Sequence, residues 1–407
     1  MDNKYSLDLT IIPKELRLLL EIMKTDNSDA LRLFEKELST DFDWELFLQL
    51  AIHHRVYPLI YSKLINRDEI RIPPYVVQTL YQEYKKNTFK MLHLSGEMEL
   101  VSKLFTENQI RLIFLKGPVI AADIYEDISL RTSKDLDILV PNTDLKRAEE
   151  LLLNNGYEKE ETPFAEWKWV NHHISYYHPQ KRIQIELHWR INPPPSKEPG
   201  FNKLWERKRI STLTSYPVYF LGKEDLILFL IEHGSRHGWF RLRWLADIDL
   251  IIRKRVISEA NNLLPENCKN NHLAGQAFIL ASLLLNTPIN KEIQLLSERK
   301  RSKKLAQLAM FFIIGAVDFH ANPSEDTLVK YHKQNPLLVK TNVQKSFFVS
   351  RYRLLLKSNM QKCFFVVKLL FPNSSDTKTL RLPKYLHFLY FPLRPMLWAW
   401  RKRRKTA

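Results

Sequence analysis

The sequence predicts an α+β fold in which a small mixed sheet is flanked by N- and C-terminal helical regions. Apolar residues recur at helical spacing in two stretches, residues 12–105 and 223–320. Between them, residues 110–190 hold short runs of branched and aromatic side chains, which are typical of strands. The order strand, helix, strand, helix, hairpin in that middle part indicates one sheet unit of roughly 80 residues.

The first helical stretch contains a long pattern of apolar residues after a break at Pro73-Pro74. Proline lacks the backbone donor that a helix interior needs, so the two prolines separate an earlier group of helices from a later one. The later pattern places apolar residues at Val76, Leu80, Tyr84, Met91, Leu94 and Leu100. We expect this helical region to lead directly into the sheet unit.

The sheet unit begins with Ile-Arg-Leu-Ile-Phe-Leu at residues 110–115, which predicts a strand. Gly117-Pro118 then turns the chain, and Pro118 suits the first position of a short helix that runs to Tyr125. Residues 135–140, Asp-Leu-Asp-Ile-Leu-Val, predict the second strand. A glycine turn therefore precedes a strand with paired acids.

A helix and a hairpin complete the unit. Asn142 or Thr143 is the predicted N-cap of a helix over residues 144–154, which stops at Asn155-Gly156. Residues 166–177 and 181–190 then predict two strands that turn at Pro179-Gln180. The whole chain is therefore expected to have four parts: a helical N-terminal region at 1–105, the α/β core at 106–192, a helical domain at 193–325 and a basic aromatic tail at 326–407.

The charge of the chain is concentrated in that tail. Of the formal net charge of +17, residues 341–407 carry +14, because they contain 15 Lys or Arg and one acid, Asp376. Residues 1–340 therefore carry only +3, which argues against an extended nucleic-acid surface on the body. Aromatic residues interleaved with cations in the tail fit an anionic membrane surface, a nucleic acid, or ordinary packing with a solvated basic end. We favour the membrane surface.

The composition sets the expected compartment. Cys268 and Cys363 are far apart in sequence, which favours two free thiols in a reducing cytoplasm over a disulfide or a cysteine zinc site. The N-terminus has no basic segment followed by a long apolar run, and no stretch offers the roughly 18 apolar residues of a spanning helix. We expect a cytoplasmic protein that the tail can hold peripherally at the inner face of the membrane.

Three acids carry the chemistry that the sequence suggests. Asp135 and Asp137 alternate with apolar residues on the second strand, so their carboxylates should lie on one face. On the strand at 181–190, Glu186 and His188 share a face opposite the apolar one. Carboxylates are the ligands that magnesium prefers. We expect Asp135, Asp137 and Glu186 to hold a divalent metal, with Glu186 activating an acceptor hydroxyl and His188 contacting a nucleotide.

Phosphate contacts are expected upstream of these acids. Gly117 would let phosphates approach the bare backbone, and the N-terminus of the following helix favours anions. Lys116 and Arg131 are candidate phosphate contacts, and a solvated or structural ion pair is the alternative for each. Glycine turn, strand acids and third acid together suggest nucleotidyl transfer.

The motifs Leu115-Lys116-Gly117, Arg131 to Val140 and Glu186-Leu187-His188-Trp189 resemble the polymerase-β-type nucleotidyltransferase superfamily. More closely, they resemble a bacterial branch labelled uncharacterised nucleotidyltransferase, whose members often accompany biosynthetic clusters. The resemblance covers residues 10–320. It implies a small mixed sheet, two Mg²⁺ (or Mn²⁺) ions and an NTP donor. The chain departs from the commoner pattern in having Lys-Gly-Pro in place of Gly-Ser, a long gap to Asp135, and Glu186 where Asp is usual.

A second group of polar residues lies in the later helical stretch, from His233 to Asp247. The closer family carries a similar His, Trp, Arg and Asp segment, and the resemblance implies that His233 and Arg243 line a nucleotide or acceptor pocket. The alternative is core packing of Trp239 and Trp244 with a buried Arg243–Asp247 pair. Zinc binding by His233 and His237 is disfavoured, because the metalloprotease glutamate is lacking. Asp247 and Asp249 follow helical spacing and should point in different directions.

The sequence thus predicts an enzyme that moves an NMP from an NTP to a hydroxyl-type acceptor, with release of pyrophosphate. Two alternatives stay open. One is a non-catalytic partner of a biosynthetic complex that binds a nucleotide or a carrier, and the other is a toxin-like tRNA nucleotidyltransferase. The histidines at 172, 173 and 178 are interpreted as polar packing rather than a metal site.

Overall fold

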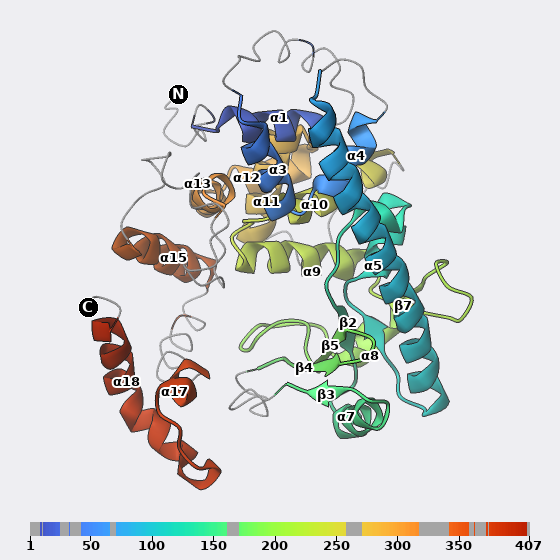
Figure 1. Ribbon diagram of the computed structural model, residues 1–407, viewed down its shortest axis with the longest axis vertical. Coiled ribbons are helices and arrows are strands. Elements are labelled where there is room, and N and C mark those ends of the chain that lie inside the picture. The colour runs from blue at the N-terminus through green and yellow to red at the C-terminus, as the bar shows by residue number, and fades with distance from the viewer. Residues whose placement is uncertain are drawn as a thin grey trace. The chain divides into compact units, whose positions relative to one another are not determined.

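The computed structural model describes residues 9, 11–24, 32, 42–65, 71–160, 171–257, 271–316, 342–357, 362, 372 and 374–404. Its contacts group the chain into two compact units (Figure 1). The helical unit consists of Met1–Glu99, Gly117–Ser133 and Arg209–Leu356, and the sheet unit of Leu100–Lys116, Lys134–Lys208 and Lys357–Ala407. Each unit is assembled from segments that are distant in the sequence. The predicted boundaries at 105, 192 and 325 stay predictions.

The sheet unit contains five strands in the order β3-β4-β5-β2-β1. They are β1 (Ile113–Phe114), β2 (Leu136–Leu139), β3 (Glu158–Lys159), β4 (His173–His178) and β5 (Ile183–His188). β2 runs parallel to β5 and antiparallel to β1, and β4 pairs antiparallel with both β5 and β3. The α+β fold with a mixed sheet is therefore confirmed. The short β3 and the hairpin of β6 (Arg209–Ile210) and β7 (Tyr219–Phe220) in the helical unit were not predicted.

The connections of the sheet follow local turn chemistry. Helix α7 (Leu145–Asn154) has Asp144 at its N-cap position without a side-chain cap bond, so the predicted cap at Asn142 or Thr143 is wrong. The reason is a turn in which the Asp144 amide donates to the Pro141 carbonyl, which delays the helix. The predicted stop is confirmed, because Gly156 has a φ of +83°, a conformation that favours glycine. The hairpin is confirmed for 173–188, and its predicted residues 166–170 lie outside the described residues.

The described parts of both predicted helical stretches, 12–105 and 223–320, are mainly helical, and residues 25–31, 33–41, 66–70, 258–270 and 317–320 lie outside the described residues. The helical unit contains α1 (Lys14–Met23), α3 (Trp44–His53), α4 (Tyr57–Leu64), α9 (Lys223–Arg236), α10 (Leu242–Ile257), α11 (His272–Leu285), α12 (Lys291–Ser297), α13 (Lys300–Ile314) and α15 (Asn342–Leu356). Short turns α6 (Pro118–Ile120), η1 (Ala121–Tyr125) and η2 (Ile128–Leu130) replace the single helix expected after Gly117. The long helix α5 (Pro74–Glu107) starts at the predicted proline break and is shared by the two units, and α8 (Phe201–Glu206) belongs to the sheet unit.

Helix α11 approaches α12 so closely that it requires a glycine. A Cβ at Gly275 would lie 2.2 Å from the Leu296 carbonyl oxygen and 2.4 Å from Ser302 Oγ. Because a backbone atom cannot move aside as a flexible side chain can, Gly275→Ala should destabilise the protein by about 3 kcal/mol. Urea unfolding measures this. Gly96→Ala on α5, where a Cβ meets nothing within 4 Å, is the matched control and should be neutral or stabilising. Equal destabilisation by both changes would contradict this packing.

The C-terminal part of the chain forms α17 (Ser374–Thr379), η5 (Lys384–Leu389) and α18 (Tyr390–Arg404). In the described part of the chain, none of the helices combines the length and the apolar content needed to cross a bilayer. The expected free thiols, Cys268 and Cys363, lie outside the described residues.

Candidate active site

Asp137 and Glu186 face each other across two parallel strands. Asp137 on β2 is the register partner of Glu186 on β5, so their side chains leave the sheet on the same face. His188 lies two residues after Glu186 and therefore on that face too. The apolar residues Ile183, Ile185 and Leu187 are buried on the opposite face, as the alternation in the sequence predicts. The strand pattern thus brings two predicted metal ligands together without any loop.

A lysine completes the charge pattern of this face. Lys116 follows β1, which pairs with β2, and its Nζ lies 2.9 Å from Asp137 Oδ1. His188 Nε2 lies 3.3 Å from Asp137 Oδ1 and 3.3 Å from Glu186 Oε2. His173 Nε2 on β4 lies 3.8 Å from the same Glu186 oxygen. Carboxylates and nitrogen groups therefore alternate along a line from Lys116 to His173.

The charges of these groups support one another. Burial alone would raise the pKa of Glu186, but the hydrogen bond with His188 and the charge of Lys116 outweigh it and lower that pKa to about 2. Burial would lower the pKa of Lys116 and of His188, yet the carboxylates around them raise both. His173 differs, since burial and the neighbouring His188 lower its pKa to about 4. At neutral pH the face therefore carries ionised Glu186, cationic Lys116 and neutral His173.

The donor set fits a divalent cation. One oxygen or nitrogen each from Asp137, Glu186 and His188 lie within 4.8 Å of one another. The carboxylate of Asp137 is 0% exposed, and its Oδ2 has no hydrogen-bond donor among the described residues. A buried carboxylate oxygen without a donor is costly unless a cation satisfies it. These residues can thus supply two hard oxygen ligands and one imidazole nitrogen.

Asp135 and Gly117 occupy positions beside this cluster in the sequence. Asp135 is half-buried and lies one residue before β2, and its charge contributes to the raised pKa of Lys116. Gly117 has a φ of +99°, a conformation that L side chains rarely adopt, so the turn after Lys116 requires glycine. The metal role of Asp135 and the phosphate role of Gly117 stay predictions.

The predicted phosphate contact Arg131 lies in the helical unit, in a buried ion pair. Its Nε donates to Asp247 Oδ1 at 2.8 Å and its Nη2 to Asp247 Oδ2 at 2.9 Å. Tyr125 Oη donates to the same carboxylate at 2.8 Å. Arg131 is 1% exposed and Asp247 0% exposed. The structural alternative is therefore realised for Arg131, and its predicted contact with nucleotide would have to compete with a bidentate carboxylate.

Arg243 and His233 are also buried in the helical unit. Arg243 does not pair with Asp247, so the pairing considered from the sequence is wrong; Arg243 donates instead to the carbonyl and the hydroxyl of Thr132. His233 packs edge-on against Trp244, with ring centroids 5.4 Å apart. Their predicted nucleotide contacts stay predictions. Asp249 binds Arg253 and Thr287, away from the partners of Asp247, as the helical spacing predicts.

His173, interpreted from the sequence as polar packing together with His172 and His178, lies beside Glu186 in this cluster. It is the register partner of His188, which places both rings on the face of Asp137. His172, His173 and His188 also form a group of imidazoles whose nitrogens lie within 4.8 Å of one another. The hairpin turn could have revealed this pairing, because a turn near residues 179–181 puts 173 opposite 188. His178 instead packs against Tyr157.

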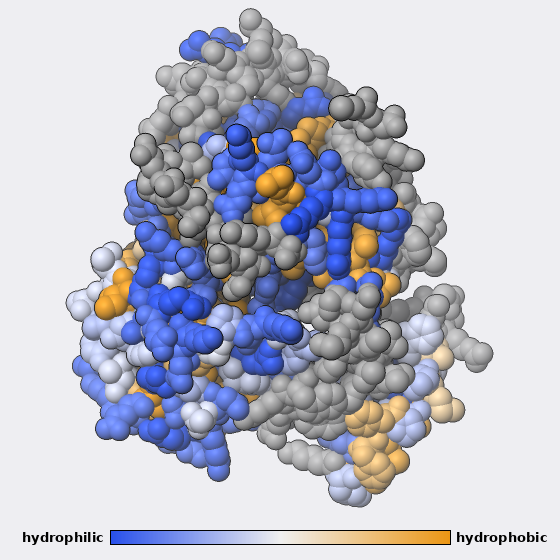
Figure 2. All heavy atoms as spheres, turned by 180° about the vertical axis from the view of Figure 1, so that it is seen from behind, coloured by the Kyte–Doolittle hydropathy of each residue, from blue (hydrophilic) through white to orange (hydrophobic). Residues whose placement is uncertain are grey.

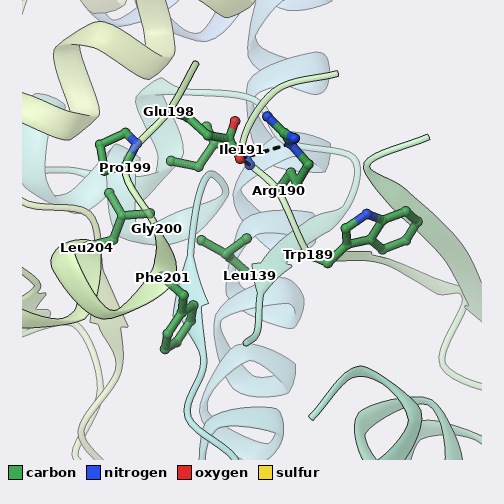
Figure 3. A pocket seen from close by; sticks show the side chains of 9 residues that line it. All are labelled: Leu139, Trp189, Arg190, Ile191, Glu198, Pro199, Gly200, Phe201 and Leu204. Atoms are coloured by element: carbon green, nitrogen blue, oxygen red, sulfur yellow. Dashed lines mark hydrogen bonds and ion pairs between the residues drawn. The ribbon is translucent and has the colours of Figure 1, made fainter. Parts of the chain in front are cut away.

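A cavity of about 260 Å³ lies at the carboxyl ends of β2 and β5 (Figure 3). Leu139, two residues after Asp137, lines it together with Phe201 and Leu204. Its polar wall is the ion pair of Arg190 and Glu198, 3.3 Å apart, in which Glu198 also accepts from two backbone amides of the turn after β5. The cavity therefore lies next to the cluster along β2, because Leu139 is on the same face of this strand as Asp137.

The chain is similar in sequence to a known protein family. The model of a family described as "Uncharacterised nucleotidyltransferase" matches residues 40–286, which include Lys116, Asp137 and Glu186. None of the curated proteins matches the chain.

Proposed function

The chain belongs to this family of uncharacterised nucleotidyltransferases, and we propose that it moves an NMP from an NTP to a hydroxyl-type acceptor. The observation that carries the proposal is the register pairing of Asp137 with Glu186 beside Lys116. Two carboxylates and an ammonium on one sheet face suit a polyphosphate, whose charge must be neutralised while it is held in place.

The proposed reaction is an in-line displacement at the α-phosphorus. The acceptor oxygen forms a bond to that phosphorus while the bond to the bridging oxygen breaks, and pyrophosphate leaves. The acceptor hydroxyl loses its proton in the process. Glu186, which is ionised at neutral pH, accepts the hydrogen bond of this hydroxyl and orients it, and the proton passes to solvent water as the new bond forms. Lys116 contacts the phosphates and opposes their charge.

A divalent cation, Mg²⁺ or Mn²⁺, would be held by Asp137, Glu186 and Asp135. When bound, it neutralises charge on the phosphates. His188 adds an imidazole nitrogen to the ligand set. Because magnesium prefers oxygen ligands, this nitrogen favours Mn²⁺ as an alternative ion. The cavity lined by Leu139, Phe201 and Leu204 is a candidate site for part of the acceptor, since Leu139 follows Asp137 by two residues on β2.

The test supplies the four α-labelled NTPs, Mg²⁺ or Mn²⁺, and a cell extract as the pool of acceptors. The intact protein should transfer label to a product whose mass identifies the acceptor. Glu186→Gln should lower the rate at least about 100-fold, because the amide lacks the negative charge that holds a metal ion and orients the acceptor hydroxyl. Glu158→Gln on the exposed edge strand β3 is the matched control and should retain full activity. Metal-dependent NTP binding without transfer would favour a non-catalytic binding partner, and absence of NTP binding would contradict the proposal.

A further inference from the structure

The C-terminal segment folds around one buried carboxylate. Asp376 at the start of α17 is 0% exposed, although it is the one acid among residues 341–407. Arg394 and Arg401, both on α18, reach it at 2.5 Å and 2.7 Å. Arg394 and Arg401 are thereby directed toward α17 and partly neutralised.

The apolar anchors of α18 lie on the same side as these arginines. Tyr390 is fully buried; its hydroxyl donates to the Leu380 carbonyl and accepts from the Leu382 amide. Leu397 is also buried. Residues 390, 394, 397 and 401 recur at intervals of three and four, which is one stripe of a helix. The inner stripe of α18 therefore consists of two anchors and two arginines.

The side chains left outside are large and apolar, the reverse of an ordinary surface helix. They are Tyr385 (77% exposed), Phe388 (63%), Met396 (69%), Trp398 (59%) and Trp400 (45%). Apolar side chains gather on this segment, at the lower right of Figure 2. The ion pairs of Arg394 and Arg401 with Asp376 determine which side of α18 faces outward. A patch of exposed aromatic and apolar side chains on that side indicates a surface that contacts an apolar partner.

The charge of the same segment indicates which kind of partner this surface binds. Residues 377–407 contain nine Lys or Arg and no Asp or Glu, and residues 401–405 read Arg-Lys-Arg-Arg-Lys. Tryptophan and tyrosine prefer the boundary between headgroups and acyl chains, and clustered cations are attracted to anionic headgroups. A nucleic acid would use cations beside stacking rings, but Arg394 and Arg401 are bound to Asp376, and Met396 offers no stacking plane.

We propose that the outer face of η5 and α18, formed by Tyr385, Phe388, Met396, Trp398 and Trp400, binds an anionic lipid membrane. The helix lies in the headgroup region with these side chains inserted, and the net positive charge of the segment attracts the anionic headgroups. This binding does not depend on the nucleotidyl transfer proposed above, because no residue of the Asp137 cluster takes part in it.

Vesicle flotation of the full chain tests the proposal. Vesicles are made of phosphatidylcholine alone or mixed with phosphatidylglycerol. The intact protein should bind the anionic vesicles at least about tenfold more tightly than the neutral ones. Met396→Ser/Trp398→Ser/Trp400→Ser should weaken that binding at least about tenfold. The matched control is Phe89→Ser/Leu92→Ser/Leu100→Ser on α5, where three apolar side chains are similarly exposed; it should bind like the intact protein.

A second variant keeps the test decisive if the first fails to fold, which circular dichroism reveals. Lys402→Gln/Arg403→Gln/Arg404→Gln retains the apolar face and should lose the preference for phosphatidylglycerol. The proposal is overturned if the intact protein does not float with anionic vesicles, or if the α5 control loses as much binding as the α18 variant. Binding of single-stranded RNA that the α18 variant abolishes, without vesicle binding, would assign the face to nucleic acid instead.

Discussion

Asp137→Asn is expected to lower the rate of nucleotidyl transfer at least about 1,000-fold, which corresponds to roughly 4 kcal/mol of transition-state stabilisation. The carboxylate is fully buried, pairs in register with Glu186 and lies 2.9 Å from the ammonium of Lys116. The amide keeps the shape of the side chain but removes the negative charge that a cation would need. Steady-state rates with saturating NTP measure the loss, and binding of Mn²⁺ by electron paramagnetic resonance should weaken in parallel.

The control for this change is Asp144→Asn, in the same unit. Asp144 precedes α7. Among the described residues, its carboxylate makes one long contact, 3.5 Å between its Oδ1 and Nη1 of the exposed Arg147. Its loss should leave the rate and the metal affinity unchanged, since exposed pairs contribute little. If Asp137→Asn retained more than a tenth of the activity with a normal fold, Asp137 would not hold the reacting metal.

Asp247→Asn is expected to destabilise the helical unit by about 3 kcal/mol or more. The change leaves the guanidinium of Arg131 buried without its counter-charge, and it weakens the hydrogen bond from Tyr125. Removing one partner of a buried pair costs more than the pair itself contributes, because the remaining charge stays desolvated. Urea unfolding, followed by circular dichroism, measures the difference.

The matched control is Glu126→Gln, which removes a salt bridge of the same unit. Glu126 and Lys254 are 78% and 41% exposed, so their pair should contribute very little to the free energy of unfolding. A destabilisation by Asp247→Asn as small as that of the control, together with a raised KM for NTP, would assign Arg131 to phosphate binding rather than to the ion pair.

Local patterns were enough to predict that Asp137 and Glu186 lie on one face of the sheet. The alternation of side chains along β5 predicted that Glu186 lies on the face opposite the apolar residues. The same alternation along the second strand predicted that Asp137 lies on the face of the sheet that carries Glu186. The helical spacing around Asp247 and Asp249 likewise predicted that they diverge. Such inferences succeed because the direction of a side chain depends on the period of its own element.

Partners distant in the chain could not be predicted in this way. Arg131 pairs with Asp247, which lies 116 residues later in the chain, and neither local sequence identifies the other residue as its partner. His173 joins the cluster through strand register, which a one-residue slip would change. The tail showed its cations and rings in the sequence, but only the fold reveals that Arg394 and Arg401 turn inward to Asp376.

Parallel reactions with α-labelled and γ-labelled NTP, using the acceptor identified from the extract, distinguish nucleotidyl transfer from phosphoryl transfer. We expect the α label to enter the product while the γ label is released as pyrophosphate, and we expect both events to stop with Asp137→Asn. Transfer of the γ label to the acceptor would show phosphoryl transfer at this face and would rule out the proposed nucleotidyl transfer.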